Sequence, residues 1–380
     1  TLPANKLVDL LTDGIIPGLG GILVFIPQIA ILFFLISILE EIGYMARAAF
    51  IFDKLMQYFG LNGRSLVALI SGGACAIPAI MSARTISGWK ERLITILVTP
   101  LISCSARIPV YTLLISFAIP SIQIGLFNLQ GIAFMGLYVL GILAALLTAL
   151  LLKWILKTDE ESYLMLELPD YKRPVFRNIY LNVYEKVKSF TLEAGKIILI
   201  ISIILWGLST YGPGDALQQA EKEAMTLAAQ ENLSDVESEN LVASYQIEAS
   251  YAGILGKTIE PIIQPLGFDW KIGIALITSF AAREVFVGTM ATIYSLGSAE
   301  DTGGLRERMM KEKNPITGEK VYSIATSLSL LIFYVFAMQC MSTLAVVKRE
   351  TNSWKWPIFQ FVFMTILAVL GSFLTYNAFS

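Results

Sequence analysis

Long apolar blocks separated by short polar segments dominate the chain. Blocks of about 20 residues have the length that an α-helix needs to cross a bilayer. Six such blocks lie near residues 21–39, 94–119, 131–152, 192–211, 322–346 and 357–378. We therefore predict an all-α polytopic membrane protein whose main partner is the lipid bilayer.

Two further apolar blocks, 65–83 and 272–296, contain residues that interrupt a regular membrane helix. Gly72, Gly73 and Pro78 lie in the first block. Glycine adds backbone freedom, and proline lacks the amide donor that a helix requires. Both blocks are predicted to be broken or re-entrant helices, which membrane proteins tolerate only where protein or a water-filled cavity covers the backbone.

Charged residues between the blocks predict the topology. Lys and Arg concentrate in segment 153–188 and flank the 65–83 block on both sides, whereas Asp and Glu concentrate in segment 213–260. Because Lys and Arg favour the cytoplasmic side, we expect 153–188 to be a cytoplasmic loop and both ends of 65–83 to face the cytoplasm. The acidic segment is expected to be an extracytoplasmic helical insertion.

The two halves of the chain resemble each other weakly. Residues 66–81 are echoed in 274–290, and 103–110 in 339–346, which aligns Cys104 with Cys340. Each half then has a broken helix followed by a Cys-bearing span, and we predict two inverted gate repeats, as in many secondary transporters. The predicted organisation is a first membrane half at 1–211 with gate 1 at about 64–120, an insertion at 212–260, and a second membrane half at 261–380 with gate 2 at about 272–348.

Composition limits the chemistry available. Hydrophobic residues make up 55% of the chain and charged residues 15%, and the basic residues gather at block ends, so we expect no nucleic-acid partner. Three cysteines, an odd number within apolar blocks, argue against a disulfide framework. Histidine is absent. Any metal ligand must therefore be a thiol, thioether, carboxylate, hydroxyl or backbone oxygen.

The three cysteines are the strongest candidates for a functional role. Cys75, Cys104 and Cys340 each lie in an apolar stretch broken by Gly, Pro or Ser. An unwound membrane helix exposes carbonyls and sulfur that can hold a borderline-soft cation in transit. The alternative is that each cysteine is simply a small buried residue.

Charged residues inside apolar blocks are further candidates. Arg107 and Pro109 follow Cys104, and an arginine there costs about 2.5–3.5 kcal/mol on insertion scales, so it needs a protein or water environment. Arg283 and Glu284 interrupt the 272–296 block and could neutralise each other or couple the two gates.

A charged segment follows the 21–39 span. Residues 41–59 carry charges through an apolar background and predict an interfacial or pocket-facing helix. Glu40, Tyr44 and Arg47 have the spacing of one helical face, and Glu41 is adjacent. These glutamates are secondary metal-ligand candidates, and the alternative is a structural Glu–Arg pair.

No enzymatic site is recognisable. Residues 253–258 read GILGKT, but a phosphate-binding loop requires glycine where Tyr251 stands and a preceding strand, for which there is no sign. We therefore expect this chain not to be an enzyme.

Several longer runs carry a resemblance to a known family. The chain resembles the membrane domain of the bacterial ferrous iron transport protein B (FeoB) family in FIPQIAILFFLISILEEIGYMARAAFIFDKLMQYFGLNGRS (25–65), CAIPAIMSARTI (75–86), ERLITILVTPLISCSARIPVY (91–111), REVFVGTMATIY (283–294) and QCMSTLAVVKRET (339–351). The resemblance covers nearly the whole chain apart from the 213–260 insertion.

That resemblance implies a multi-pass protein of the bacterial inner membrane that imports Fe(II) through two gate motifs. The gate cysteines would be Cys75 and Cys104 in gate 1 and Cys340 in gate 2. Glu40, Tyr44 and Arg47 match the family pattern E-x-x-G-Y-x-A-R. The resemblance further implies an N-terminal GTPase domain outside this chain, which would bind GTP and Mg²⁺, and small cytoplasmic regulatory Feo proteins as partners.

Two rival functions remain open at this point. A carrier of nucleosides or other organic solutes also suits inverted hairpin-and-span repeats, and it predicts stacking aromatic side chains and Asn or Gln in the gates. A non-transporting membrane receptor or assembly subunit would use its polar intramembrane residues only to bind partner helices.

Overall fold

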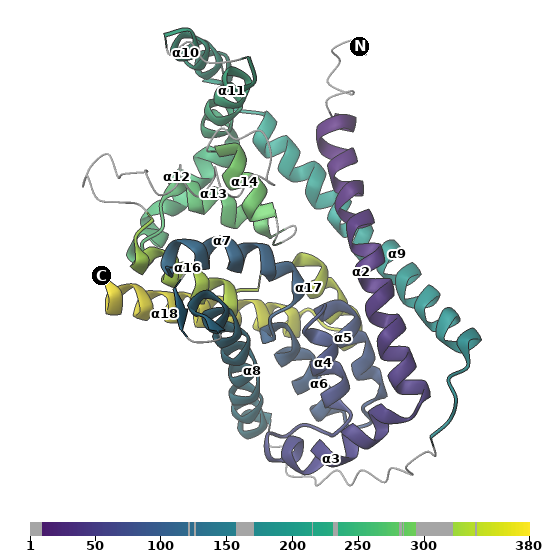
Figure 1. The fold of residues 1–380 in the computed structure, drawn as a ribbon. Coiled ribbons are helices and arrows are strands. Elements are labelled where there is room, and N and C mark those ends of the chain that lie inside the picture. Colours follow the sequence, from purple (N-terminus) through teal and green to yellow (C-terminus); the bar gives the residue numbers. More distant parts are fainter. Residues whose placement is uncertain are drawn as a thin grey trace.

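The protein is helical almost throughout (Figure 1). The computed structural model describes residues 10–120, 122–124, 127–156, 171–214, 216–230, 235–280, 283, 285–293, 322–338 and 340–380. Within these ranges the only strands are β1 (Gln123–Ile124) and β2 (Phe127–Asn128), which pair antiparallel. The all-α prediction is confirmed.

The helices of the first half are η1 (Leu10–Ile15), α2 (Ile16–Glu41), α3 (Tyr44–Tyr58), α4 (Ser65–Gly72), α5 (Ala76–Ser82), η2 (Ala83–Thr85), α6 (Trp89–Val98), η3 (Thr99–Leu101), η4 (Ser105–Arg107), α7 (Ile108–Ala118), α8 (Leu129–Leu156) and α9 (Phe176–Thr210). Those that follow are α10 (Ala216–Gln230), α11 (Asp235–Ala249), α12 (Tyr251–Ile263), η5 (Gln264–Leu266), α13 (Trp270–Ser279), α14 (Val285–Ile293), α16 (Ile324–Phe336), α17 (Met341–Thr351) and α18 (Lys355–Phe379).

Several helical segments are long and apolar enough to cross a membrane. Among the described residues, four pass this test: Trp89–Ala118, Leu129–Leu156, Ile324–Thr351 and Lys355–Phe379. The bent pair Ile29–Glu41 and Tyr44–Tyr58 would make a fifth. Large apolar side chains on α8 and α18 are exposed, among them Leu147 and Leu374, as expected for surfaces that face lipid. The chain is therefore a multi-pass membrane protein.

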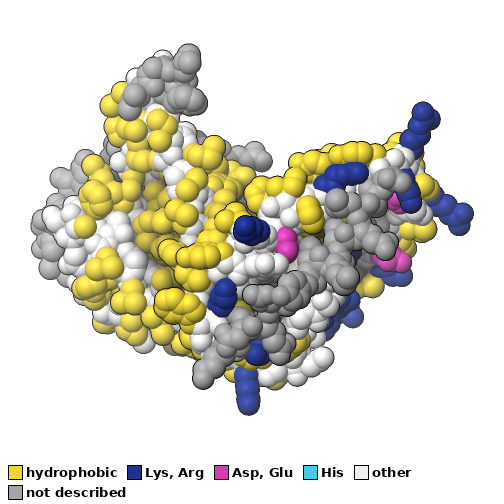
Figure 2. Space-filling view, turned by 90° about the horizontal axis from the view of Figure 1, so that it is seen from below, with side chains coloured by type: hydrophobic (Ala, Val, Ile, Leu, Met, Phe, Trp, Pro, Cys, Tyr) yellow, Lys and Arg dark blue, Asp and Glu magenta, His cyan; other side chains and the backbone are white. Residues whose placement is uncertain are grey.

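The described residues that flank the basic segment lie at a different end of the molecule from the acidic insertion, and the sidedness itself stays a prediction. The C-terminal end of α8 and the N-terminal end of α9 lie near α3 at the bottom of Figure 1, whereas α10 and α11 project at the top. Seen from below, Lys and Arg side chains lie apart from a broad apolar area (Figure 2). The basic segment 153–188 thus has its described flanks at the end opposite the acidic insertion.

One of two predicted segments has a different boundary in the structure. The insertion at 212–260 is helical as expected, and α10 to α12 account for it. However, α9 begins at Phe176, so the last part of the predicted loop 153–188 is already helix. The helix α9 packs along α2 over much of its length (Figure 1).

The chain bends sharply between α2 and α3. The two helices meet at 81°, and Gly43 between them has φ 86°, a left-handed conformation that glycine adopts without strain. The prediction that Glu40, Tyr44 and Arg47 share one helical face is therefore wrong, because Glu40 ends one helix and Tyr44 starts the next.

Four segments are discontinuous helices. The predicted breaks within 65–83 and 272–296 are confirmed as α4–α5 and α13–α14. The predicted spans 94–119 and 322–346, whose stretches around Cys104 and Cys340 were expected to be broken, are divided into α6–α7 and α16–α17. At these interruptions, backbone carbonyls that lack a helical donor accept hydrogen bonds from other segments of the protein.

Candidate functional site

Each of the three cysteines directly precedes a helical segment at a break. Cys75 is the N-cap of α5, Cys104 the N-cap of η4, and Cys340 the N-cap of α17. All three have extended backbone conformations, are half-buried, and are thiols. Each thiol therefore lies where helical hydrogen bonding is interrupted. This is the arrangement that the sequence suggested.

The two breaks of gate 1 are joined to each other. The Ala74 carbonyl accepts hydrogen bonds from the Ser105 amide, at 3.3 Å, and from the Ser105 hydroxyl, at 3.0 Å. Because Ala74 precedes Cys75 and Ser105 follows Cys104, this contact brings the two cysteine-bearing segments together. One freed carbonyl is thus satisfied by protein.

Glycine allows the close approach on which this junction depends. Gly72 is the last residue of α4, and a Cβ atom there would lie 3.1 Å from the Thr99 Cγ2 atom of η3. Gly73 and Ala74 complete the break. Pro78 lies inside the first turn of α5, and Pro109 in that of α7, where a missing amide donor costs little. The glycines, more than the prolines, thus mark this break.

Gate 2 has a matching connection. The Met341 amide donates to the Phe280 carbonyl at 3.3 Å, so the residue after Cys340 binds the end of α13. In both gates the residue that follows the cysteine of the second discontinuous helix reaches the break of the first. The inverted-repeat prediction itself remains a prediction.

Arg107 is completely buried beside the gate 1 break. Its guanidinium donates to the Pro100 carbonyl at 3.2 Å, to the Leu101 carbonyl at 3.4 Å, and to the Ser103 hydroxyl at 3.2 Å. The carbonyls at the end of a helix carry partial negative charge, so they stabilise the buried cation. Protein atoms surround Arg107, as the sequence predicted.

Arg283 has a similar position in gate 2. It is 5% exposed and donates to the Ala337 carbonyl at 3.2 Å, just beyond the end of α16. Ala337 and Leu101 lie at the same distance along the chain before Cys340 and Cys104. A buried guanidinium therefore caps the helix before the cysteine in each gate. Glu284, which the sequence suggested as a neutralising partner for Arg283, lies outside the described residues.

A glutamine that we did not predict as a site residue donates hydrogen bonds to backbone carbonyls of gate 1. Pro100 cannot donate a hydrogen bond, which leaves the Ile96 carbonyl without its helical partner. The buried Gln360 side chain of α18 donates to this carbonyl at 3.2 Å and to the Leu97 carbonyl at 2.8 Å. A lone glutamine within an apolar span was the available signal.

Glu40 and Glu41 lie apart from the gate breaks. They line a cleft of about 450 Å³ between α2 and α9, together with Ser37, Lys172, Asn178 and Asn182. The Asn178 amide donates to Glu41 at 2.7 Å, and Asn182 donates to Ser37 at 3.0 Å. Lys186 on the same α9 has a pKa below its usual value because of burial and the nearby Arg84, with Glu40 acting in the opposite direction.

Arg47 has an aromatic partner. Its guanidinium carbon lies 3.5 Å from the centre of the Tyr171 ring, a cation–π contact. Tyr44 is 52% exposed at the start of α3. Among the described residues, no ion pair joins Arg47 to Glu40 or Glu41, in contrast to the structural pair considered above.

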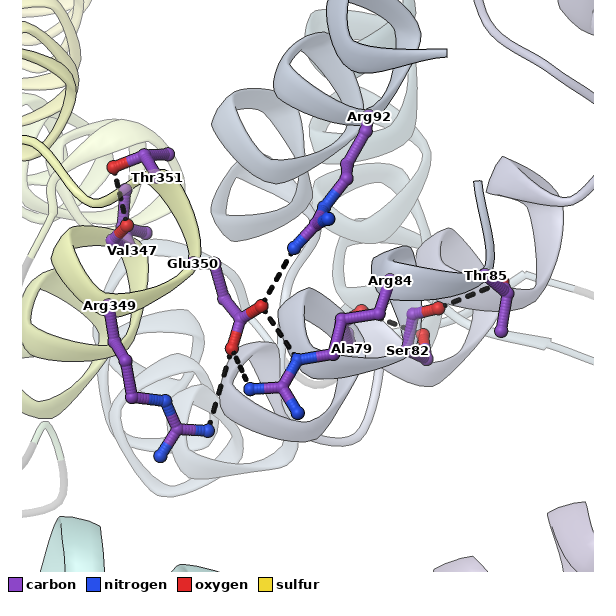
Figure 3. A network of polar contacts seen from close by, with 9 residues as sticks. All are labelled: Ala79, Ser82, Arg84, Thr85, Arg92, Val347, Arg349, Glu350 and Thr351. Carbon is purple, nitrogen blue, oxygen red and sulfur yellow. Dashed lines mark hydrogen bonds and ion pairs between the residues drawn. The ribbon is translucent and has the colours of Figure 1, made fainter. Parts of the chain in front are cut away.

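The most charged cluster of the described structure was not among the predicted site residues. The Glu350 side chain, 1% exposed, accepts from Arg84 at 2.6 and 2.8 Å, from Arg92 at 3.0 Å and from Arg349 at 3.5 Å. Figure 3 shows the three guanidinium groups converging on this carboxylate. The hydrogen bond to Glu350 raises the pKa of Arg84. Glu350 is buried, whereas Arg84 and Arg349 are partly exposed, so water screens their share of the attraction.

These geometries define a class of protein: a multi-pass helical membrane protein with discontinuous helices. Within the described residues, no group of three or more Cys, Asp or Glu side chains is arranged to hold a metal ion. The cysteines thus belong to successive breaks, and they do not form one closed site there.

Comparison with known proteins assigns the family. The family described as "Gate: Nucleoside recognition" matches residues 22–118 and 191–354, and "Ferrous iron transport protein B C terminus" matches 134–186. The chain belongs to the Gate family, and the second match together with the FeoB relatives below shows that it belongs to the FeoB family. No solved structure matched it.

Several curated relatives are similar over almost the whole chain. A protein named Fe(2+) transporter FeoB from Leptospira interrogans is 48% identical over 377 residues, which are 99% of this chain and 52% of the relative. One of the same name from Methanocaldococcus jannaschii is 36% identical over 96% of this chain and 49% of its own length. A Porphyromonas gingivalis protein, named as a fusion of Fe(2+) transport protein A and Fe(2+) transporter FeoB, is 39% identical over 99% of this chain and 45% of its own length. The chain spans about half the length of these relatives.

Proposed function

We propose that this chain is the membrane domain of a ferrous iron importer. The observation that carries the proposal is the placement of Cys75, Cys104 and Cys340, each directly before a helical segment at a break, in two gates with matching connections. The names of the relatives support Fe(II) as the substrate. The ion would pass from one thiol-bearing break to the next.

The chemistry of the residues suits a transported ion better than a resident one. Fe(II) binds weakly among the divalent transition metals, and thiolate is a soft ligand that can favour it. A break that offers one thiol and a few carbonyls would hold the ion only briefly. In this proposal Arg107 and Arg283 stabilise the ends of the discontinuous helices, because both donate to carbonyls there. Neither of these hydrogen bonds uses a thiol.

The proposal includes parts outside this chain. A GTPase domain N-terminal to it would bind GTP and Mg²⁺ and control the gates, and this chain would itself carry no hydrolase site. Small cytoplasmic Feo proteins would be partners, which the name of the fused P. gingivalis relative supports. The location would be the bacterial inner membrane, with 153–188 cytoplasmic and 212–260 extracytoplasmic.

Iron transport by the intact protein in liposomes tests the proposal. Under anaerobic, reducing conditions we expect Fe(II) entry to fall in Cys75→Ser, Cys104→Ser and Cys340→Ser variants, and X-ray absorption to show sulfur around bound iron. Ser323→Ala, which removes the N-cap of α16 without touching a thiol, serves as the matched control. Unchanged transport in all three cysteine variants would remove the thiols from the mechanism.

A second candidate function follows from the description of the Gate family, which names nucleoside recognition. The same liposomes, supplied with a labelled nucleoside in place of iron, distinguish the two. Nucleoside entry without iron entry would replace our proposal.

A further inference from the structure

The ion-pair cluster around Glu350 connects the two gates. Arg84 follows α5 in gate 1, Arg92 lies on α6 of gate 1, and Glu350 is the penultimate residue of α17 in gate 2. The Glu350 carboxylate accepts hydrogen bonds from both guanidinium groups (Figure 3). Two regions of the chain that are more than 250 residues apart thus share one buried carboxylate.

The two helices that this cluster joins are those that begin with gate cysteines. α5 starts after Cys75 and leads to Arg84, and α17 starts after Cys340 and leads to Glu350. The helices pack against each other, and Ile77, Ile80 and Met81 share an apolar cluster with Val346 and Val347. Each helix therefore carries a thiol at its beginning and one half of the ion pair at or just beyond its end.

A short helix moves as a rigid body, since its backbone hydrogen bonds fix its length. A change at the ion pair is therefore transmitted to the cysteine at the other end. The two sides of the ion pair differ in exposure, because the Glu350 side chain is 1% exposed whereas that of Arg84 is 53% exposed. This difference favours an ion pair that opens by movement of Arg84. Arg84 can leave into water, but Glu350 cannot lose its partners without leaving a buried charge.

We propose that Glu350 is a positioning residue for transport: its ion pairs with Arg84 and Arg92 hold α5 against α17 and thereby limit access to Cys75 and Cys340. Release of Arg84 would let the two half-helices separate and expose both thiols. This inference rests on the proposed function, to which it adds the contact that couples gate 1 to gate 2.

Thiol accessibility tests this inference without requiring iron transport. The intact protein in liposomes permeable to the reagent is treated with a water-soluble maleimide, and the alkylation rate of each cysteine is followed by peptide mass spectrometry. In Glu350→Gln we expect Cys75 and Cys340 to react about tenfold faster than in the native protein, which corresponds to a shift of about 1.4 kcal/mol towards the open form. Cys104, which belongs to neither helix, should change much less.

Two further variants distinguish the loss of this ion pair from misfolding and from the loss of any ion pair. Arg84→Gln leaves Glu350 paired with Arg92 and Arg349, so it should fold and show a smaller increase at the same two cysteines. Glu248→Gln removes an exposed ion pair with Lys257 in the insertion and is the matched control, with native rates expected.

Two outcomes would overturn the inference. One is native alkylation rates at Cys75 and Cys340 in folded Glu350→Gln and Arg84→Gln proteins. The other is an equal increase at all three cysteines, since this would indicate general loosening of the fold. Iron entry measured on sealed liposomes that contain the same protein variants keeps the two proposals separate. If native protein moves no iron while Cys75 and Cys340 respond as expected, the proposed function fails and the coupling stands.

Discussion

Replacement of Arg107 by methionine tests how the broken helix of gate 1 is stabilised. Methionine keeps an unbranched apolar stem but is shorter and has no donor, so the substitution removes hydrogen bonds to the Pro100 and Leu101 carbonyls, at 3.2 and 3.4 Å, and to the Ser103 hydroxyl. Ser103 retains its contact with the Tyr111 hydroxyl at 3.0 Å. The two carbonyls then lose their guanidinium donor in a region where Arg107 itself is 0% exposed.

The magnitude follows from the number of carbonyls affected. A buried polar group without a partner costs about 1–3 kcal/mol, so two carbonyls cost about 2–6 kcal/mol. Removal of a buried charge offsets part of this loss, and we expect the free energy of unfolding to fall by about 2–4 kcal/mol. Arg283→Met removes the hydrogen bond to one carbonyl, that of Ala337, and should cost about half as much.

Denaturant unfolding in detergent, followed by tryptophan fluorescence, measures these values. Arg107→Lys retains the charge but not the planar fork of donors, so its stability should lie between the native protein and Arg107→Met. An Arg107→Met protein as stable as the native one would refute the reasoning. A larger loss in Arg283→Met than in Arg107→Met would refute the comparison between the gates.

Two other substitutions test backbone features of gate 1. Gly72→Val should lower the free energy of unfolding by about 1–3 kcal/mol through contact with Thr99, whereas Gly131→Val on α8, where no atom lies within 4 Å of the added Cβ, should have little effect. Equal losses in the two variants, measured by the same unfolding experiment, would show that strain at Gly72 is not the cause. Gln360→Leu should cost about 1–3 kcal/mol because two carbonyls lose their donor. Asn377→Leu on the same helix, where the amide is exposed, should be neutral, and a neutral Gln360→Leu would contradict our account of Pro100.

Residue patterns predicted much of the secondary structure. Apolar block length indicated most of the spans, and Gly72 and Gly73 indicated the break before Cys75, because these properties act within one segment of chain. The pattern also marked all three cysteines as lying in interrupted stretches, and each precedes a helical segment at a break. Where the prediction was wrong, as for Glu40, Tyr44 and Arg47, a single glycine changed the direction of the chain by 81°.

The partners of the freed backbone groups could be known only from the tertiary structure. A sequence shows that Arg107 and Arg283 are costly in an apolar block, but not which carbonyls they meet. The Glu350 cluster is the clearest case, since Arg84 and Arg92 are separated from it by more than half of the chain. Local hydrophobicity determined that this chain inserts into a membrane as helices. Packing between distant segments decided which groups stabilise the breaks, because an interrupted membrane helix is stable only when other parts of the protein supply its missing hydrogen bonds.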